Sequence, residues 1–113
     1  MAPIRVLLVE DNEVYRSSLE LVLGLQEGLL VVGCVAEGAA AGEAAAALEA
    51  DVALVDFRLA DVDGEAAVVC LTAEATDEER AAVLAAGAAA LVEKGEPIER
   101  LVAAVREAAK EEP

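Results

Sequence analysis

Five short apolar runs alternate with helical patterns, and this alternation is the feature that most restricts the fold. The runs occupy residues 4–9, 29–35, 51–57, 66–72 and 89–94. Apolar residues at helical spacing, or Ala-rich composition, predict helices over about 13–26, 39–50, 76–87 and 96–112. Apolar strands separated by helices form a parallel sheet with helices on both faces, so the pattern predicts an α/β, doubly wound domain.

Residue types at the helix ends support these boundaries. Asn12 is a suitable N-terminal cap for the first helix, and Gly28 follows its end. Thr76 or Asp77 can cap the helix that ends before Gly87.

Length and charge limit the classes of partner. The chain has 113 residues, enough for one domain, and carries 23 acidic against 8 basic residues, a net charge of −15. Such a chain repels phosphate backbones and anionic lipid, so we expect neither direct nucleic-acid binding nor membrane binding. No apolar stretch reaches the roughly 18 to 20 residues that span a bilayer, and the first residues lack the features of a signal peptide, so we expect a cytoplasmic protein. The absence of His excludes the usual zinc sites and His-based catalysis.

Polar residues stand at the ends of four of the five predicted strands. Glu10 and Asp11 follow the first strand, Asp56 ends the third, Thr72 ends the fourth and Lys94 ends the fifth. Because sites in such sheets form at the carboxyl ends of the strands, we expect these side chains to converge. Each also has an ordinary structural alternative: the acids at a helix start, the threonine in a strand, the lysine in solvent.

This set of groups suits phosphoryl transfer to an aspartate. Clustered carboxylates repel one another, and Mg²⁺, which prefers oxygen ligands, relieves that repulsion. A carboxylate can act as a nucleophile and form an aspartyl-phosphate, while cations and donors meet the charge of the transferred group.

Four motifs in order resemble the receiver domain of two-component response regulators. They are "LLVEDNE", "ALVDFRLADVDG", "VCLTA" and "LVEKG", and the resemblance covers essentially the whole chain. It implies a flavodoxin-like (CheY-like) fold, a five-stranded parallel sheet in the order 2-1-3-4-5. The wording around residues 9–23 and 93–105 is similar to the subgroup that often carries a helix-turn-helix output domain.

The resemblance also implies roles for single residues. Asp56 is the phosphoacceptor; Asp11, Asp56 and the backbone carbonyl of Arg58 bind Mg²⁺. Glu10 acts through a water ligand or orients Lys94.

The implied partners follow from that chemistry. A histidine kinase donates the phosphoryl group, Thr72 and Lys94 bind its oxygens, and the resulting change of surface controls an output domain or a downstream protein, with transcription as the expected output. We expect residues 1–113 to form one receiver domain, any output domain to lie beyond Pro113, and the domain not to be an enzyme.

The connection between the third and fourth strands departs from the family pattern. About ten residues, 58–67, join them where the family has a full third helix. Either that helix is shortened or missing in this protein, or the given sequence lacks residues between Gly64 and Val68. We expect Asp61 and Asp63 to be turn residues. A lost helix predicts exposed apolar surface near Val55 and Val69, and with it self-association, which places a homodimer among the candidate partners.

Two further departures concern the fifth strand, where Leu91 replaces an aromatic residue and Gly95, in place of Pro, follows the lysine.

Two other functions compete with the phosphate switch. One is a receiver-fold scaffold that is never phosphorylated and acts by protein contacts. The other is a phosphatase-like hydrolase, which Arg58 disfavours because such enzymes usually have a second Asp at that position.

Overall fold

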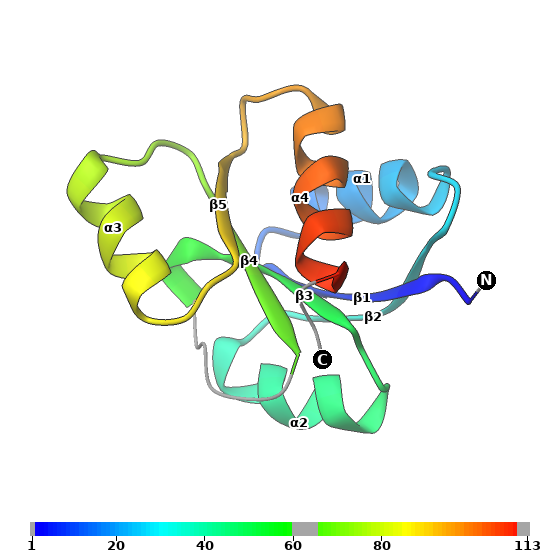
Figure 1. Cartoon of the computed structure of the whole chain (residues 1–113). Coiled ribbons are helices and arrows are strands. Elements are labelled where there is room, and N and C mark those ends of the chain that lie inside the picture. The colour runs from blue at the N-terminus through cyan, green and yellow to red at the C-terminus, as the bar shows by residue number, and fades with distance from the viewer. Residues whose placement is uncertain (1, 60–65, 111–113) are drawn as a thin grey trace.

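The sheet has five parallel strands in the predicted order, β2-β1-β3-β4-β5 (Figure 1). The computed structural model describes residues 2–59 and 66–110. The strands are β1 (Ile4–Val9), β2 (Leu29–Val35), β3 (Val52–Asp56), β4 (Ala67–Thr72) and β5 (Ala90–Glu93). The flavodoxin-like prediction is confirmed.

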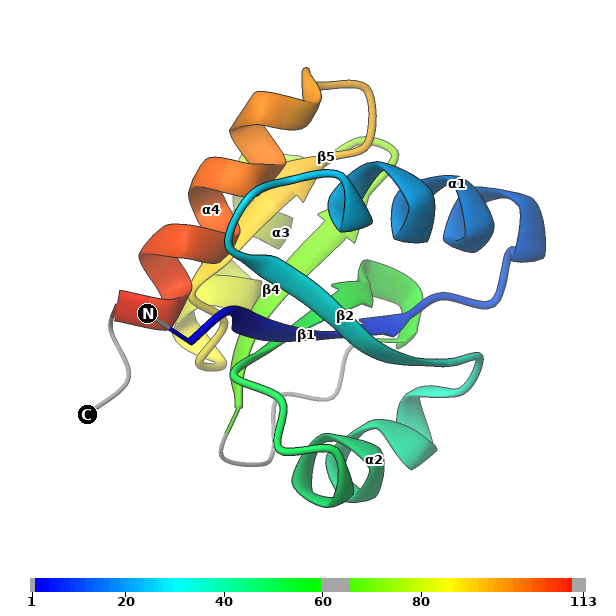
Figure 2. The same ribbon diagram turned by 90° about the vertical axis from the view of Figure 1, so that its right-hand side faces the viewer.

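Helices cover both faces of the sheet, because each crossover between parallel strands must pass over one face. The helices are α1 (Glu13–Gly24), α2 (Ala41–Ala47), α3 (Asp77–Ala85) and α4 (Ile98–Lys110), with 3₁₀ turns η1 (Gly38–Ala40) and η2 (Phe57–Leu59). Figures 1 and 2 show α1 and α4 on one side of the sheet and α2 on the other.

The predicted helix ends are confirmed at three positions. The Asn12 side chain accepts a hydrogen bond from the backbone N–H of Tyr15. Thr76 and Glu79 form a reciprocal capping box at the start of α3. Gly87, after α3, has φ +114°, a conformation that side chains with a Cβ rarely adopt.

Two apolar cores lie on the two faces of the sheet, because side chains alternate along each strand. The first joins β1, β3 and β4 to α1 and α4, through residues such as Leu8, Leu54 and Val105. The second lies under α2 and α3 and includes Leu7, Val9, Val55, Cys70 and Leu91.

The prediction of exposed apolar surface near Val55 and Val69 is wrong. Val55 is 1% exposed and Val69 is fully buried. Val55 pairs with Cys70, so Val69 points to the opposite face, which α1 and α4 cover. On the face of Val55, Phe57 and Leu59 of η2 pack against the second core. The described residues therefore offer no such surface for the predicted homodimer.

The connection between β3 and β4 contains one 3₁₀ turn, η2, within the described residues. Asp61, Asp63 and Gly64 lie outside them, as do the predictions made for those positions. The turn packs closely on the start of η1: a Cβ at Gly38 would collide with the backbone oxygen of Leu59. Glycine at position 38 is therefore required by the approach of two backbones.

The cysteines are unpaired, as their places in the sheet require. Cys34 lies on β2 and Cys70 on β4, with β1 and β3 between them. None of the helices in residues 2–59 and 66–110 has the length and apolar character that crossing a bilayer requires.

Candidate functional site

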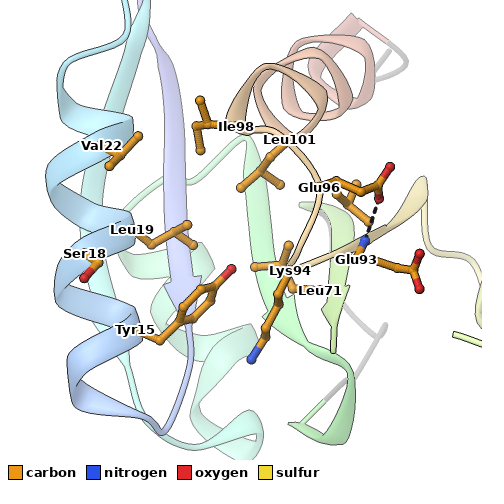
Figure 3. A pocket seen from close by; sticks show the side chains of 11 residues that line it. Tyr15, Ser18, Leu19, Val22, Leu71, Glu93, Lys94, Glu96, Ile98 and Leu101 are labelled. Atoms are coloured by element: carbon orange, nitrogen blue, oxygen red, sulfur yellow. Dashed lines mark hydrogen bonds between the residues drawn. The ribbon is translucent and has the colours of Figure 1, made fainter. Parts of the chain in front are cut away.

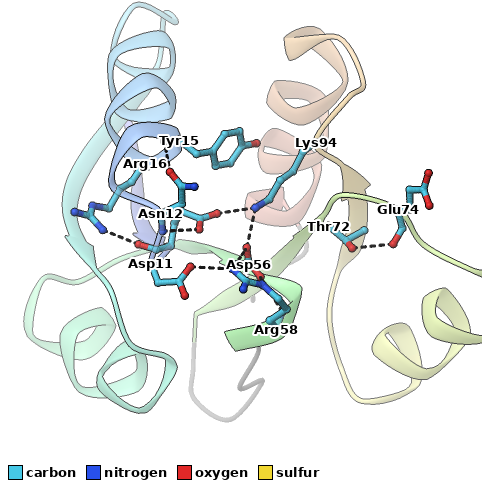
Figure 4. Close-up of polar contacts among 10 residues, drawn as sticks. Asp11, Asn12, Tyr15, Arg16, Asp56, Arg58, Thr72, Glu74 and Lys94 are labelled. Carbon is cyan, nitrogen blue, oxygen red and sulfur yellow. Dashed lines mark hydrogen bonds and ion pairs between the residues drawn. The ribbon is translucent and has the colours of Figure 1, made fainter.

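Three carboxylates meet at the carboxyl edge of the sheet, where β1 and β3 lie side by side (Figure 4). Glu10 and Asp11 follow β1, and Asp56 is the last residue of β3. One oxygen from each lies within 4.8 Å of the others. Glu10 and Asp56 are each 3% exposed, so their charges need partners inside the protein.

Lys94 supplies the first cation. Its Nζ donates to Glu10 Oε1 at 2.8 Å and to Asp56 Oδ2 at 2.7 Å. The end of β5 fixes its position, because its backbone N–H donates to the carbonyl of Thr72 at 2.7 Å. Burial lowers the pKa of Lys94, but the hydrogen bonds to Asp56 and Glu10 outweigh burial and raise it. The side chain is therefore an ammonium at neutral pH.

Arg58 supplies the second cation, from the turn that follows β3. Its Nε donates to Asp56 Oδ1 at 3.2 Å, and its Nη2 donates to Asp11 Oδ1 at 2.9 Å. Its backbone N–H also donates to Asp56 Oδ1, at 2.9 Å. The Arg58 side chain is 67% exposed, yet it bridges two acids.

These contacts determine the charge of Asp56. Burial raises its pKa, but hydrogen bonds from Lys94 and Arg58 outweigh burial and lower the pKa to about 2. Asp56 is therefore an ionised carboxylate at neutral pH, in a place from which water is largely excluded. Such a group is a nucleophile whose two oxygens are already oriented by donors.

Glu10 is held at both oxygens. Its Oε2 accepts from the backbone N–H of Asn12 at 3.0 Å, while Oε1 faces Lys94. Its backbone carbonyl accepts from Arg16 Nη1 at 2.7 Å. Of the two roles predicted for Glu10, these contacts favour orienting Lys94.

Tyr15 is a site residue that was not predicted from the sequence. Its ring lies 4.5 Å, measured to the centroid, from Lys94 Nζ, a cation–π distance. The signal was its position: a helix capped at Asn12 places residue 15 in the first turn, facing the strand ends. Burial raises the pKa of Tyr15, and Glu10 and Asp56 add to this effect while Lys94 opposes it.

Thr72 occupies the predicted place at the end of β4 but has another partner. Its hydroxyl donates to the backbone carbonyl of Glu74 at 2.9 Å, and Figure 4 shows it apart from the carboxylates. The residue is 9% exposed. The structure thus brings Glu10, Asp11, Asp56, Arg58 and Lys94 together and leaves the Thr72 hydroxyl aside.

The carboxylate cluster has the donor set that a hard divalent cation uses. Glu10, Asp11 and Asp56 could hold a metal ion, and all three offer oxygen. Mg²⁺ and Ca²⁺ prefer such ligands, whereas softer metals prefer sulfur or nitrogen.

The sequence model of one protein family, the response regulator receiver domain, matches residues 6–106 of this chain. The chain belongs to this family. The transcriptional regulatory protein LiaR of Bacillus subtilis is 30% identical over 122 positions, which cover 97% of this chain and 58% of LiaR. A protein-glutamate methylesterase/protein-glutamine glutaminase of Anaeromyxobacter dehalogenans is 38% identical over 64% of this chain and 21% of its own length.

Solved structures agree with this receiver-domain fold. The receiver domain of the response regulator NarL from Mycobacterium tuberculosis superposes with a TM-score of 0.87 at 28% identity, covering 98% of this chain and 99% of that one. The response regulator domain of Thermotoga maritima CheB has a TM-score of 0.82 at 22% identity, covering 98% and 99%. The likeness to CheB, at this identity, is one of fold.

The relatives differ from this receiver domain in length. The chain spans between a fifth and three fifths of the curated relatives that it matches. The alignment with LiaR has 122 positions although it covers 97% of a 113-residue chain, so roughly a dozen positions of LiaR have no counterpart here.

A groove of about 320 Å³ borders the receiver's site on the side of Tyr15 (Figure 3). It lies between α1 and the start of α4, with Leu19, Leu71 and Leu101 among its lining residues. Lys94 stands at one end of it, so the groove adjoins the ammonium that contacts Asp56.

Proposed function

We propose that this receiver domain accepts a phosphoryl group on Asp56 from a histidine kinase, with Mg²⁺, and thereby switches the surface that controls an output. The observation that carries the proposal is the setting of Asp56: a buried, ionised carboxylate contacted by Lys94 on one oxygen and lying beside Asp11. This setting favours nucleophilic attack by the carboxylate.

In this proposal Mg²⁺ would be held by Asp11, Asp56 and the backbone carbonyl of Arg58, as the resemblance implies. When bound, it supplies positive charge next to the phosphoryl oxygens. Glu10 has a separate task, because both of its oxygens are occupied by Lys94 and by the Asn12 N–H. It keeps the ammonium beside the acceptor oxygen.

In the transfer step an oxygen of Asp56 attacks phosphorus of the kinase's phosphohistidine. The new O–P bond forms as the N–P bond breaks, and the imidazole nitrogen takes up a proton from water. Lys94 Nζ has three protons and donates two of them in hydrogen bonds to Asp56 and Glu10. It can turn from Asp56 Oδ2 to a phosphoryl oxygen without leaving Glu10, which offsets the new charge.

The same step can move Thr72. Its hydroxyl now donates to the carbonyl of Glu74, in the loop before α3. A phosphoryl oxygen on Asp56 is a stronger acceptor than that carbonyl, since a charged acceptor strengthens a hydrogen bond about twofold. Exchange of partner would release the loop and shift the population of its conformations. Leu91, buried under α3, takes the place of the usual aromatic switch residue.

The kinase must dock beside the site, because its phosphohistidine has to reach Asp56. Helix α1 borders the site, and three exposed apolar residues lie on it or at its C-terminal cap: Val14 (78%), Leu21 (67%) and Leu25 (76%). We propose that the kinase covers this face. Leu21→Gln should then slow transfer from the kinase but not from acetyl phosphate. Leu84→Gln, an exposed leucine on α3, is the control; equal loss in both variants would contradict the docking face.

The names of the relatives bear on the output. LiaR, named as a transcriptional regulator, matches across 97% of this chain, whereas the methylesterases match 64% and 77%. We propose on this ground that residues 1–113 are the receiver domain of a regulator of transcription and that the receiver itself catalyses no reaction on an external substrate.

Incubation with acetyl phosphate and Mg²⁺ tests the acceptor directly. Intact-mass spectrometry should show one phosphoryl group on the wild type and on Asp77→Asn, which changes an exposed acid of α3. Asp56→Asn should show none. Absence of labelling in the wild type, with kinase and with acetyl phosphate, would favour the alternative of a scaffold that acts by protein contacts alone.

A further inference from the structure

The guanidinium of Arg58 lies across the two carboxylates that belong to the candidate metal site. Nε and Nη2 donate to Asp56 Oδ1 and Asp11 Oδ1, at 3.2 and 2.9 Å, and Nη2 also lies 3.4 Å from Asp56 Oδ2. We propose that Arg58 acts as an internal counter-cation that competes with Mg²⁺ for Asp11 and Asp56. This inference rests on the metal site of the proposed function.

The charges of the site support competition. Three carboxylates face two cations, Lys94 and Arg58, which leaves one net negative charge. If a divalent ion bound while both cations stayed in place, the site would have a net positive charge. The ion and the Arg58 guanidinium would also repel each other, because both would contact the same carboxylate oxygens. Exchange of Arg58 for the ion brings the site to neutrality. The side chain and the ion are thus alternative partners of Asp11 and Asp56.

The exposure of Arg58 allows it to leave. Its side chain is 67% exposed, and Asp11 is also open to solvent. Lys94, by contrast, is 23% exposed and holds two buried acids. The two cations therefore divide the work: Lys94 stays with Asp56 and Glu10, and Arg58 moves between the carboxylates and water. Without the ion, Arg58 offsets part of the negative charge of the site, and it weakens the binding of the ion.

The expected size of this effect follows from the kind of ion pair. Pairs between exposed side chains are usually worth a factor of about 1.5 to 5 in an equilibrium. Arg58 contacts a buried carboxylate as well as an exposed one, so we expect its effect on the binding constant to lie at or above the upper end of that range. Arg58→Gln should tighten Mg²⁺ binding by about 3- to 10-fold at low salt, and less as salt screens the pair.

Calorimetric titration of metal-free protein with MgCl₂ measures the competition. Arg58→Gln and Arg58→Ala should both bind more tightly than the wild type. Arg100→Gln removes the same charge from the exposed side of α4 and should change the affinity less than twofold. Asp11→Asn should lose most of the affinity, which ties the heat to this site.

Displacement of the side chain has its own signal. The Nε–H of Arg58, hydrogen-bonded to Asp56, gives an arginine resonance in a ¹H–¹⁵N spectrum that Arg58→Gln identifies. Addition of MgCl₂ should broaden or shift this resonance toward that of a free arginine, while the resonance of Arg16, bound to the Glu10 carbonyl, should persist.

The outcomes separate the two proposals. Equal Mg²⁺ affinity in the wild type and both Arg58 variants, with Asp56 still labelled by acetyl phosphate, overturns the competition and leaves the proposed function standing. Equal tightening in Arg100→Gln overturns it too, because the effect would be one of net charge. If neither the wild type nor Arg58→Gln binds Mg²⁺, the competition and the metal site fail together.

Discussion

Lys94→Met should destabilise the domain strongly, because it leaves two buried acids without their ammonium. Glu10 and Asp56 are each 3% exposed, and Lys94 Nζ contacts both at 2.8 Å or less. Removing one partner of a buried ion pair costs about 3–5 kcal/mol. Because Lys94 is 23% exposed, water can reach the two acids in the variant and solvate them in part. We therefore expect the free energy of unfolding to fall by about 2–4 kcal/mol at pH 7.

Urea unfolding in EDTA measures this loss. Lys110→Met, which changes an exposed lysine at the end of α4, should cost less than about 0.5 kcal/mol. Adding Asp56→Asn to Lys94→Met should recover at least about 1 kcal/mol, since it removes one of the two stranded charges. This double variant also keeps the test informative if Lys94→Met alone does not fold.

The loss should depend on pH in a defined direction. The pKa of Asp56 falls from 3.8 to about 2 on folding, so this contribution is complete above pH 4 and is lost as the pH falls through about 2. Without Lys94 the pKa of Asp56 rises, and the difference between wild type and Lys94→Met should shrink between pH 7 and pH 3. A loss below 0.5 kcal/mol, or one that is the same at both pH values, would refute the reasoning.

Three further changes test other parts of the structure. Gly38→Ala should cost about 1–3 kcal/mol in urea unfolding, because its Cβ meets the backbone of η2, whereas Gly24→Ala, with open space around it, should be neutral or slightly stabilising. Thr76→Ala should cost about 1 kcal/mol in the same assay through loss of the capping box. Burial raises the pKa of the Cys70 thiol to about 11, so a thiol reagent at pH 8 should modify Cys34, which is partly exposed, well before Cys70 in the folded protein; equal rates would contradict the burial of Cys70.

Four of the five strand ends could be predicted because their apolar runs stop at a polar residue. Glu10, Asp11 and Lys94 follow strands and Asp56 ends one, and parallel pairing alone brings strand ends to one edge. No such rule fixes the register between two strands. The pairing of Val55 with Cys70 places Val69 on the face that α1 and α4 cover, and η2 packs against the core beside Val55, so neither residue is exposed as expected.

Side-chain partners were harder to predict than backbone positions. Helical spacing alone does not say which apolar residues of α1 face the core: Leu19 is buried, whereas Val14 is 78% exposed. Arg58 comes two residues after Asp56, and its side chain reaches Asp11 only because of the conformation of the turn η2 that follows β3. The hydroxyl of Thr72 has a local carbonyl within reach, which composition does not reveal.

The central claim is that Asp56 is the residue that accepts the phosphoryl group. Borohydride reduces an acyl phosphate to an alcohol, so the wild type treated with acetyl phosphate and Mg²⁺, then reduced and digested, should carry the change on the peptide of β3, at Asp56. A reduced residue at any other acid, or labelling that persists in Asp56→Asn, would contradict the account.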